Sequence, residues 1–136
     1  MNNTDYVFLM YNAESTIQTK CCDFAARITK MVAYLQRKRG KLYNPIYNQI
    51  LRSGTSIMAN VSESQYAQSR ADFITKLHIA LKEANETKNW LRLLFASGCL
   101  LEKEFKSINN DCGEILAILT ASLNTAKKND LADKAR

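Results

Sequence analysis

Polar side chains recur at helical spacing in the middle of the chain, and they are the first candidates for a functional site. One row follows steps of four, four and three, and it consists of Arg52, Ser56, Asn60 and Glu63. Such steps place side chains on one face of a helix. A second row contains His78, Lys82, Asn85 or Glu86, and Asn89. The rows are either solvated surface or a polar network between helices or subunits, in which Arg52 meets Glu86 or Glu63.

Basic side chains are concentrated in one segment of a chain whose formal net charge is +6. Residues 27–41 contain no acid and six basic residues, which equal the whole excess: Arg27, Lys30, Arg37, Lys38, Arg39 and Lys41. Residues 44–126, in contrast, hold eight basic and eight acidic residues. Because a basic cluster attracts phosphate groups, RNA or DNA is a candidate ligand.

Residues typical of catalytic or metal sites are sparse. His78 is the only histidine and lies outside any Glu-x-x-His motif. Cys21 and Cys22 are adjacent, and neither Cys99 nor Cys112 has a partner at C-x-x-C spacing, which favours reduced structural thiols. We find no glycine-rich phosphate loop and no nucleophile with its base. The sequence therefore predicts a protein that is not an enzyme and that has no metal site and no cofactor.

Long helices must position these residues. The 136-residue chain has the length of one domain, and its four glycines and one proline are too few for many short strands. Its shares of 46% hydrophobic and 24% charged residues are ordinary for a soluble globular protein. The apolar segment from Tyr6 to Tyr11 is too short to span a membrane and lacks the preceding basic residues of a signal peptide. We therefore expect a cytoplasmic protein without membrane association.

Apolar residues recur at steps of three and four along four segments, which predicts four amphipathic helices. The expected boundaries are about 14–39, 45–68, 70–97 and 102–129, with tails at 1–12 and 131–136. Asn44 before Pro45 is a typical helix start, and Ser69 resembles the first residue of a capping box. Gly40 and Gly98 suit the left-handed position that follows a helix.

Connections of two to five residues favour antiparallel neighbours. We therefore predict an all-α fold, in which residues 1–136 form a single antiparallel up-and-down four-helix bundle. In that bundle the end of the first helix, the start of the second, the end of the third and the start of the fourth lie together. One positively charged end would then contain Arg37, Lys38, Arg39, Lys41, Arg52, Arg92, Lys103 and Lys106.

Three stretches carry a resemblance to a known family: residues 49–63 (QILRSGTSIMANVSE), residues 73–87 (FITKLHIALKEANET) and residues 90–94 (WLRLL). Across about residues 14–125 the chain resembles the four-helix bundle proteins encoded by intervening sequences in bacterial 23S rRNA genes. By motif position, Glu86 matches the family's acid on the third helix. The signature of its second helix is matched by Arg52, Ser56, Asn60 and Glu63.

The resemblance implies a homo-oligomer, because family members assemble into barrel-shaped pentamers. A related branch is the accessory protein of diversity-generating retroelements, in which a basic pentamer binds a reverse transcriptase and nucleic acid. Two functions follow as expectations. The first is a non-enzymatic oligomer that binds RNA or another nucleic acid through its positively charged end. The second is a protein-interaction scaffold or accessory subunit, in which the polar rows and the Tyr6 to Tyr11 segment contact sister subunits or another protein.

Overall fold

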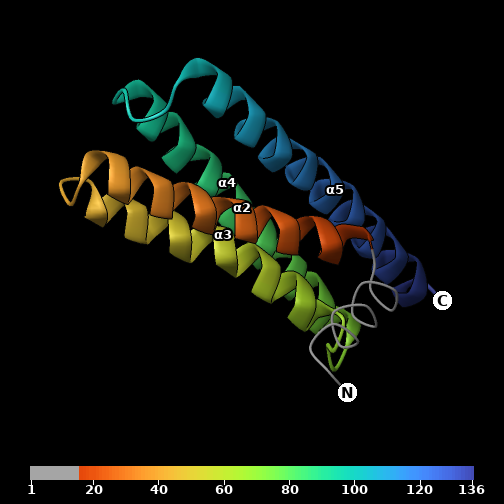
Figure 1. Cartoon of the computed structure of the whole chain (residues 1–136). Coiled ribbons are helices and arrows are strands. Elements are labelled where there is room, and N and C mark those ends of the chain that lie inside the picture. Colours follow the sequence, from red (N-terminus) through yellow and green to blue (C-terminus); the bar gives the residue numbers. More distant parts are fainter. Residues whose placement is uncertain (1–15) are drawn as a thin grey trace.

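A computed structural model describes residues 16–136, which form four α-helices and, within that range, no strand. In chain order the helices are α2 (Thr16–Arg39), α3 (Asn44–Ser64), α4 (Arg70–Ala96) and α5 (Glu102–Lys134). Consecutive helices run antiparallel and form an up-and-down bundle (Figure 1). The predicted all-α four-helix fold is confirmed. The segment from Tyr6 to Tyr11 lies outside the described residues.

The heptad-like apolar positions of all four helices meet in one core. Cys21, Phe24, Ile28 and Leu35 of α2 are buried there, at steps of three, four and seven, and Val32 joins them. The other helices contribute the following residues: Tyr47, Ile50, Ile57 and Val61 of α3, Leu77, Ala80, Ala84, Leu91 and Leu94 of α4, and Ile108, Cys112, Ile115, Leu119 and Leu123 of α5. The same period of three and four residues therefore specifies both the helices and the faces that they bury.

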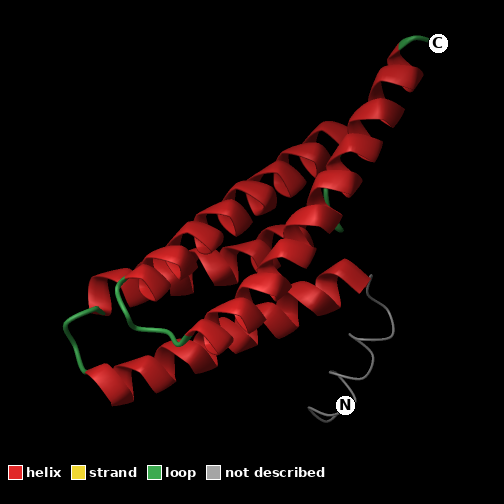
Figure 2. Cartoon of the chain, turned by 90° about the horizontal axis from the view of Figure 1, so that it is seen from above, coloured by secondary structure: helices red, strands yellow, loops and turns green. Residues whose placement is uncertain are grey.

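Helix ends differ from the sequence-based boundaries in two places. The second helix was expected to reach residue 68, but α3 ends at Ser64, and the following Tyr66 is solvent-exposed. The fourth helix was expected to end at residue 129, but α5 continues to Lys134. Arg70 supports this extension because its guanidinium donates to the carbonyl of Asn129 (3.2 Å) and pairs with Asp133. The last turns of α5 project beyond the neighbouring helices (Figure 2).

The helix caps were predicted with mixed success. Ser69 starts α4, and its hydroxyl accepts from the backbone N–H of Asp72 at 3.1 Å, as expected for a capping residue. Asn44 was expected to cap α3, and this prediction is wrong because Tyr43 occupies the cap position without a side-chain bond. The Asn44 amide oxygen instead accepts from Gln36 Nε2 at 3.2 Å, across the turn from α2.

A left-handed glycine closes the turn between α4 and α5. Gly98 has a φ of 78°, which costs little only for a residue without a Cβ. Its N–H donates to the carbonyl of Phe95 (3.0 Å), and the N–H of Cys99 donates to the carbonyl of Leu94 (2.9 Å). These two bonds form a Schellman motif, so α4 stops sharply and α5 returns beside it. Gly40, with a φ of 73°, follows α2, and its N–H donates to the carbonyl of Gln36 (2.9 Å).

Gly54 lets α2 and α3 approach closely. A Cβ at this position would lie 3.1 Å from Ile28 Cγ2 and 3.3 Å from Ile28 Cγ1. Ile28 is fully buried and β-branched, so its side chain has little freedom to move aside. Gly113 of α5 is also helical, but a Cβ there would meet nothing within 4 Å.

The two glycines should therefore respond oppositely to alanine. We expect Gly54→Ala to lower the free energy of unfolding by about 1 kcal/mol, because overpacking costs more than the helix propensity that alanine gains. Gly113→Ala should raise it by about 0.5–1 kcal/mol, because only the propensity changes. Urea unfolding followed by circular dichroism measures both values. A stabilised Gly54→Ala variant would show that the helices can separate at no cost.

Candidate functional site

Basic side chains from three helix ends gather at one end of the bundle. Arg37, Lys38 and Arg39 form the last turn of α2, and Lys41 follows in the turn to α3. Arg92 lies near the end of α4 and Lys103 near the start of α5, beside the other turn (Figure 1). The side chain of Arg39 joins the two turns, since its Nε donates to the carbonyl oxygen of Cys99 at 3.1 Å.

Most of these cations are free of carboxylate partners. Arg37, Lys38, Lys41, Arg92 and Lys103 are exposed, and no carboxylate of residues 16–136 lies within ion-pair distance of them. We call these five residues the basic end. The nearby acids are engaged elsewhere: Glu102 pairs with Lys106 at 3.0 Å, and the carboxylate of Glu104 accepts from the backbone N–H of Leu101 at 2.8 Å. The basic end therefore presents positive charge that no neighbouring carboxylate neutralises.

Arg52 does not join the basic end. Its guanidinium reaches from α3 to α4, where it contacts Glu83 (3.2 Å) and Glu86 and has its charge neutralised by two carboxylates. Trp90 Nε1 donates to the same Glu86 oxygen that Arg52 contacts, at 3.2 Å. The hydrogen bond from Arg52 lowers the pKa of the Glu86 carboxyl against the opposing effect of burial. Arg52 thus joins α3 to α4 within one chain. We call Arg52, Glu83 and Glu86 the clamp.

The remaining polar residues of the α3 row bond locally. Ser56 donates its hydroxyl to the carbonyl of Arg52 (2.6 Å), and Asn60 donates its amide to the carbonyl of Ser56 (2.8 Å). Glu63 pairs with Lys76 of α4 at 2.8 Å and not with Arg52. On α4, four members of the predicted row are solvent-exposed: His78, Lys82, Asn85 and Asn89. Glu86 is the one member of that row that contacts Arg52.

Two parts of this interhelical network were missed by the sequence reasoning. Glu83 precedes Glu86 by three residues and thus shares its face, a spacing that could have identified the second carboxylate. The hydroxyls of Ser53 and Thr87 lie 2.8 Å apart in the buried interface between α3 and α4. Both residues have the spacing of the buried apolar residues of their helices, but a pattern that counts only apolar residues does not include them.

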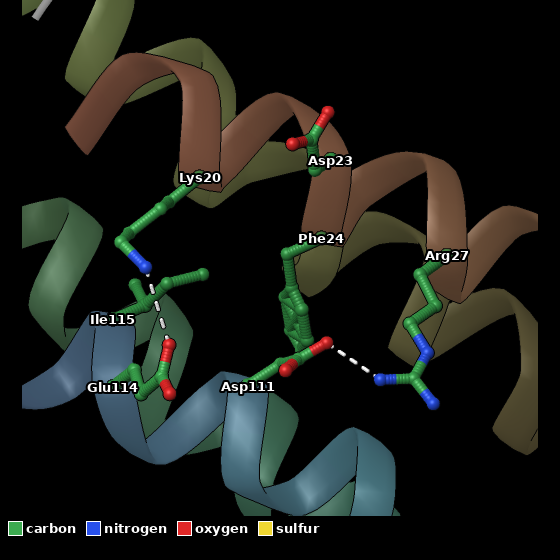
Figure 3. A pocket seen from close by; sticks show the side chains of 7 residues that line it. All are labelled: Lys20, Asp23, Phe24, Arg27, Asp111, Glu114 and Ile115. Carbon is green, nitrogen blue, oxygen red and sulfur yellow. Dashed lines mark hydrogen bonds and ion pairs between the residues drawn. The ribbon is translucent and has the colours of Figure 1, made fainter. Parts of the chain in front are cut away.

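Polar side chains also bridge the seam between α2 and α5, where the two helices pack only lightly (Figure 3). Arg27 Nη1 lies 2.6 Å from Asp111 Oδ2, and Lys20 Nζ lies 3.2 Å from Glu114 Oε2. Phe24 projects between these pairs and, with Ile115, lines a groove of about 220 Å³. Arg27 also donates to Ser107 Oγ at 2.6 Å, so this member of the basic segment holds α5 in place.

No disulfide joins the four cysteines within residues 16–136. Burial raises the pKa of Cys21 and of Cys112 to about 12, which leaves both thiols protonated and weakly nucleophilic at neutral pH. Within residues 16–136, no group of three or more histidine, cysteine, aspartate or glutamate residues could hold a metal ion. No helix in the same range is long and apolar enough to cross a membrane.

The substitution Glu86→Gln should lower the stability of the protein at neutral pH more than at acidic pH. Glutamine can still accept from Trp90 but loses the charge that pairs with Arg52, so we expect the variant to be roughly 0.5–1 kcal/mol less stable at pH 7. Because the pKa of Glu86 is lowered in the folded state, its contribution is present above about pH 4 and is lost as pH falls further. Urea unfolding of both proteins at neutral and acidic pH measures this difference.

A matched control is Glu63→Gln, which removes the ion pair of Glu63 with Lys76, also between α3 and α4. The Glu63 side chain is 58% exposed, whereas that of Glu86 is 35% exposed, so the control should lose less stability at pH 7. Equal losses for Glu86→Gln at both pH values would contradict the role of its charge.

Comparison with known proteins agrees with this architecture. The family model described as 23S rRNA-intervening sequence protein matches residues 13–121. A solved structure from Bacteroides thetaiotaomicron VPI-5482, described as a protein with unknown function from the S23 ribosomal protein family, is 45% identical. The match covers 79% of this chain and 98% of that chain, with a TM-score of 0.76. No curated protein shows significant similarity. The chain therefore belongs to the family of 23S rRNA-intervening sequence proteins.

Proposed function

We propose that this protein is a non-enzymatic, cytoplasmic homo-oligomer that binds RNA, or another nucleic acid, through its basic end. The observation that carries the proposal is the grouping of five exposed cations without carboxylate partners among residues 16–136, in or near two turns that the Arg39 side chain links. Nucleic-acid affinity arises largely from the release of counterions when such cations neutralise phosphates. The bond of Arg39 to Cys99 links the two turns beside the basic end.

The resemblance to pentameric family members supports the oligomeric part of the proposal. Repeating one basic end in several subunits would let one RNA contact more than one of them, which raises the overall affinity without new types of contact. Arg52 and Glu86 are paired within the chain, so the clamp is not required to hold subunits together.

Neutralising three residues of the basic end should weaken RNA binding and lower its salt dependence. We expect the triple variant Arg37→Gln, Lys38→Gln, Lys41→Gln to lose roughly 10- to 100-fold in affinity at low salt. The slope of log affinity against log salt should fall by about 2, given a contribution of ~0.7 per phosphate of a single strand. Fluorescence anisotropy with a labelled RNA at several salt concentrations measures both changes.

The matched control carries the same change of charge elsewhere. Lys82→Gln, Lys127→Gln, Lys128→Gln removes three exposed lysines of the middle of α4 and the far part of α5. It should bind RNA within about a factor of three of the unmodified protein, because these lysines are remote from the basic end. A control as weak as the triple variant would indicate that only net charge matters. Absence of RNA binding to the unmodified protein at low salt would refute the proposal.

A second candidate function, a protein-interaction scaffold or accessory subunit, is supported by exposed apolar side chains beside the basic end. Leu42 lies in the turn between α2 and α3, Leu101 lies in the turn between α4 and α5, and both are exposed, as is Leu93 of α4. Exposed apolar residues that cluster are typical of surfaces that contact another protein. Such a contact would join sister subunits or a partner protein.

We expect Leu101→Ser to shift the protein toward a smaller mass in light scattering. Serine favours the position before a helix, so α5 should keep its start while the apolar contact is lost. Leu131→Ser is the control, because Leu131 is 68% exposed, compared with 60% for Leu101, but lies near the opposite end of the bundle. Unchanged mass for both variants would contradict a subunit contact at Leu101.

A further inference from the structure

An exposed aromatic ring stands between two lysines on the outer face of α2. Lys30, Tyr34 and Lys38 follow one another at steps of four, so their side chains share one face. Tyr34 is 40% exposed, and both lysines are exposed without a carboxylate partner among residues 16–136. The lysines are about 12 Å apart along the helix axis at 1.5 Å per residue, with the ring between them.

A groove opens beside Tyr34, between α2 and α5. Its volume is about 290 Å³, near the lower limit of typical ligand pockets, so it suits one small ring system better than a larger ligand. Met31, Leu100 and Ile108 supply apolar lining. Its polar lining consists of Arg27, Lys30 and Glu104, together with the ring of Tyr34.

The arrangement separates a phosphate contact at Lys38 from a place for a base in the groove, which Lys30 lines. Lys38 Nζ lies 5.5 Å from the centroid of the Tyr34 ring and comes one turn later along α2, whereas Arg27, Lys30 and Met31 line the groove one and two turns earlier. The groove side of Tyr34 is therefore separate from the Lys38 side. The carboxylate of Glu104 repels phosphate from the groove but can accept a hydrogen bond from an amino group of a base.

From this geometry we infer that Tyr34 and the adjoining groove bind an unpaired nucleobase, with the phosphates on either side contacting Lys30 and Lys38. The inference rests on the proposed binding of RNA and narrows the ligand to single strands. Aromatic rings flanked by cations bind single strands because any exposed base can stack on them. In an A-form duplex the bases are stacked inside and unavailable to a side chain on a helix surface.

The test compares one short unpaired RNA with a duplex of the same length, by fluorescence anisotropy at low salt. Tyr34→Ala should weaken single-strand binding roughly 5- to 100-fold and leave duplex binding unchanged. Tyr34→Phe keeps the ring and should bind the single strand as the unmodified protein does. Circular dichroism verifies that both variants fold.

Lys30→Ala is the matched control for a phosphate contact one turn away. It should weaken the binding of both RNAs and lower the salt dependence, whereas Tyr34→Ala should leave the salt dependence unchanged. The inference is overturned if Tyr34→Ala affects both RNAs equally, if it affects neither, or if Tyr34→Phe is as weak as Tyr34→Ala. In these cases the proposed binding through the basic end still stands, whereas failure of the unmodified protein to bind either RNA would overturn both.

Discussion

Short connections between long helices impose the arrangement on which every surface of this molecule depends. Residues 40–43 and 97–101 are all that separates α2 from α3 and α4 from α5, so each pair must turn back on itself. Gly40 and Gly98 make such sharp turns feasible. As a result, cations that are up to 66 positions apart in sequence, from Arg37 to Lys103, share one end of the bundle. The basic end is a product of topology and would not exist in any isolated helix.

The interfaces between helices use different physical means. Ile28 fills the space that Gly54 leaves open between α2 and α3, and the contact of α3 with α4 adds the buried hydroxyl pair of Ser53 and Thr87. The seam of α2 with α5 has the lightest packing and is bridged by exposed or half-exposed ion pairs. Such pairs contribute little stability and weaken in salt. It is along this seam that the groove beside Tyr34 opens, lined in part by Leu100 and Ile108 of the core.

The sequence was sufficient for the fold and for most of the core, because a period of three and four residues specifies both the helix and its buried face. Phe95 is an exception: it follows the buried Leu91 by four residues, a spacing that predicts burial, yet it is partly exposed and stacks on Phe105 near the turn. Helix ends were less predictable, since α5 is prolonged by Arg70, a residue from another helix.

Long polar side chains were the hardest to place from sequence alone. The sequence makes Arg52 a candidate for both the positively charged end and the polar network. Only the packing of α3 against α4 shows that its guanidinium contacts Glu83 and Glu86. The role proposed for Tyr34 is likewise not predictable from the sequence alone, because the groove forms only where α5 lies beside α2. Spacing along a helix predicts which residues share a face but not what that face meets.

The antiparallel arrangement has an electrical consequence. At the basic end two helices finish and two begin, so the partial negative charges of the α2 and α4 carboxyl ends are offset by the partial positive charges of the α3 and α5 amino ends. The backbone then contributes little net potential there, and the field outside this end comes from the side chains themselves. The five residues of the basic end make no ion pair within residues 16–136, so each could be exchanged with little effect on the scaffold, which would allow one bundle to be adapted to different polyanions.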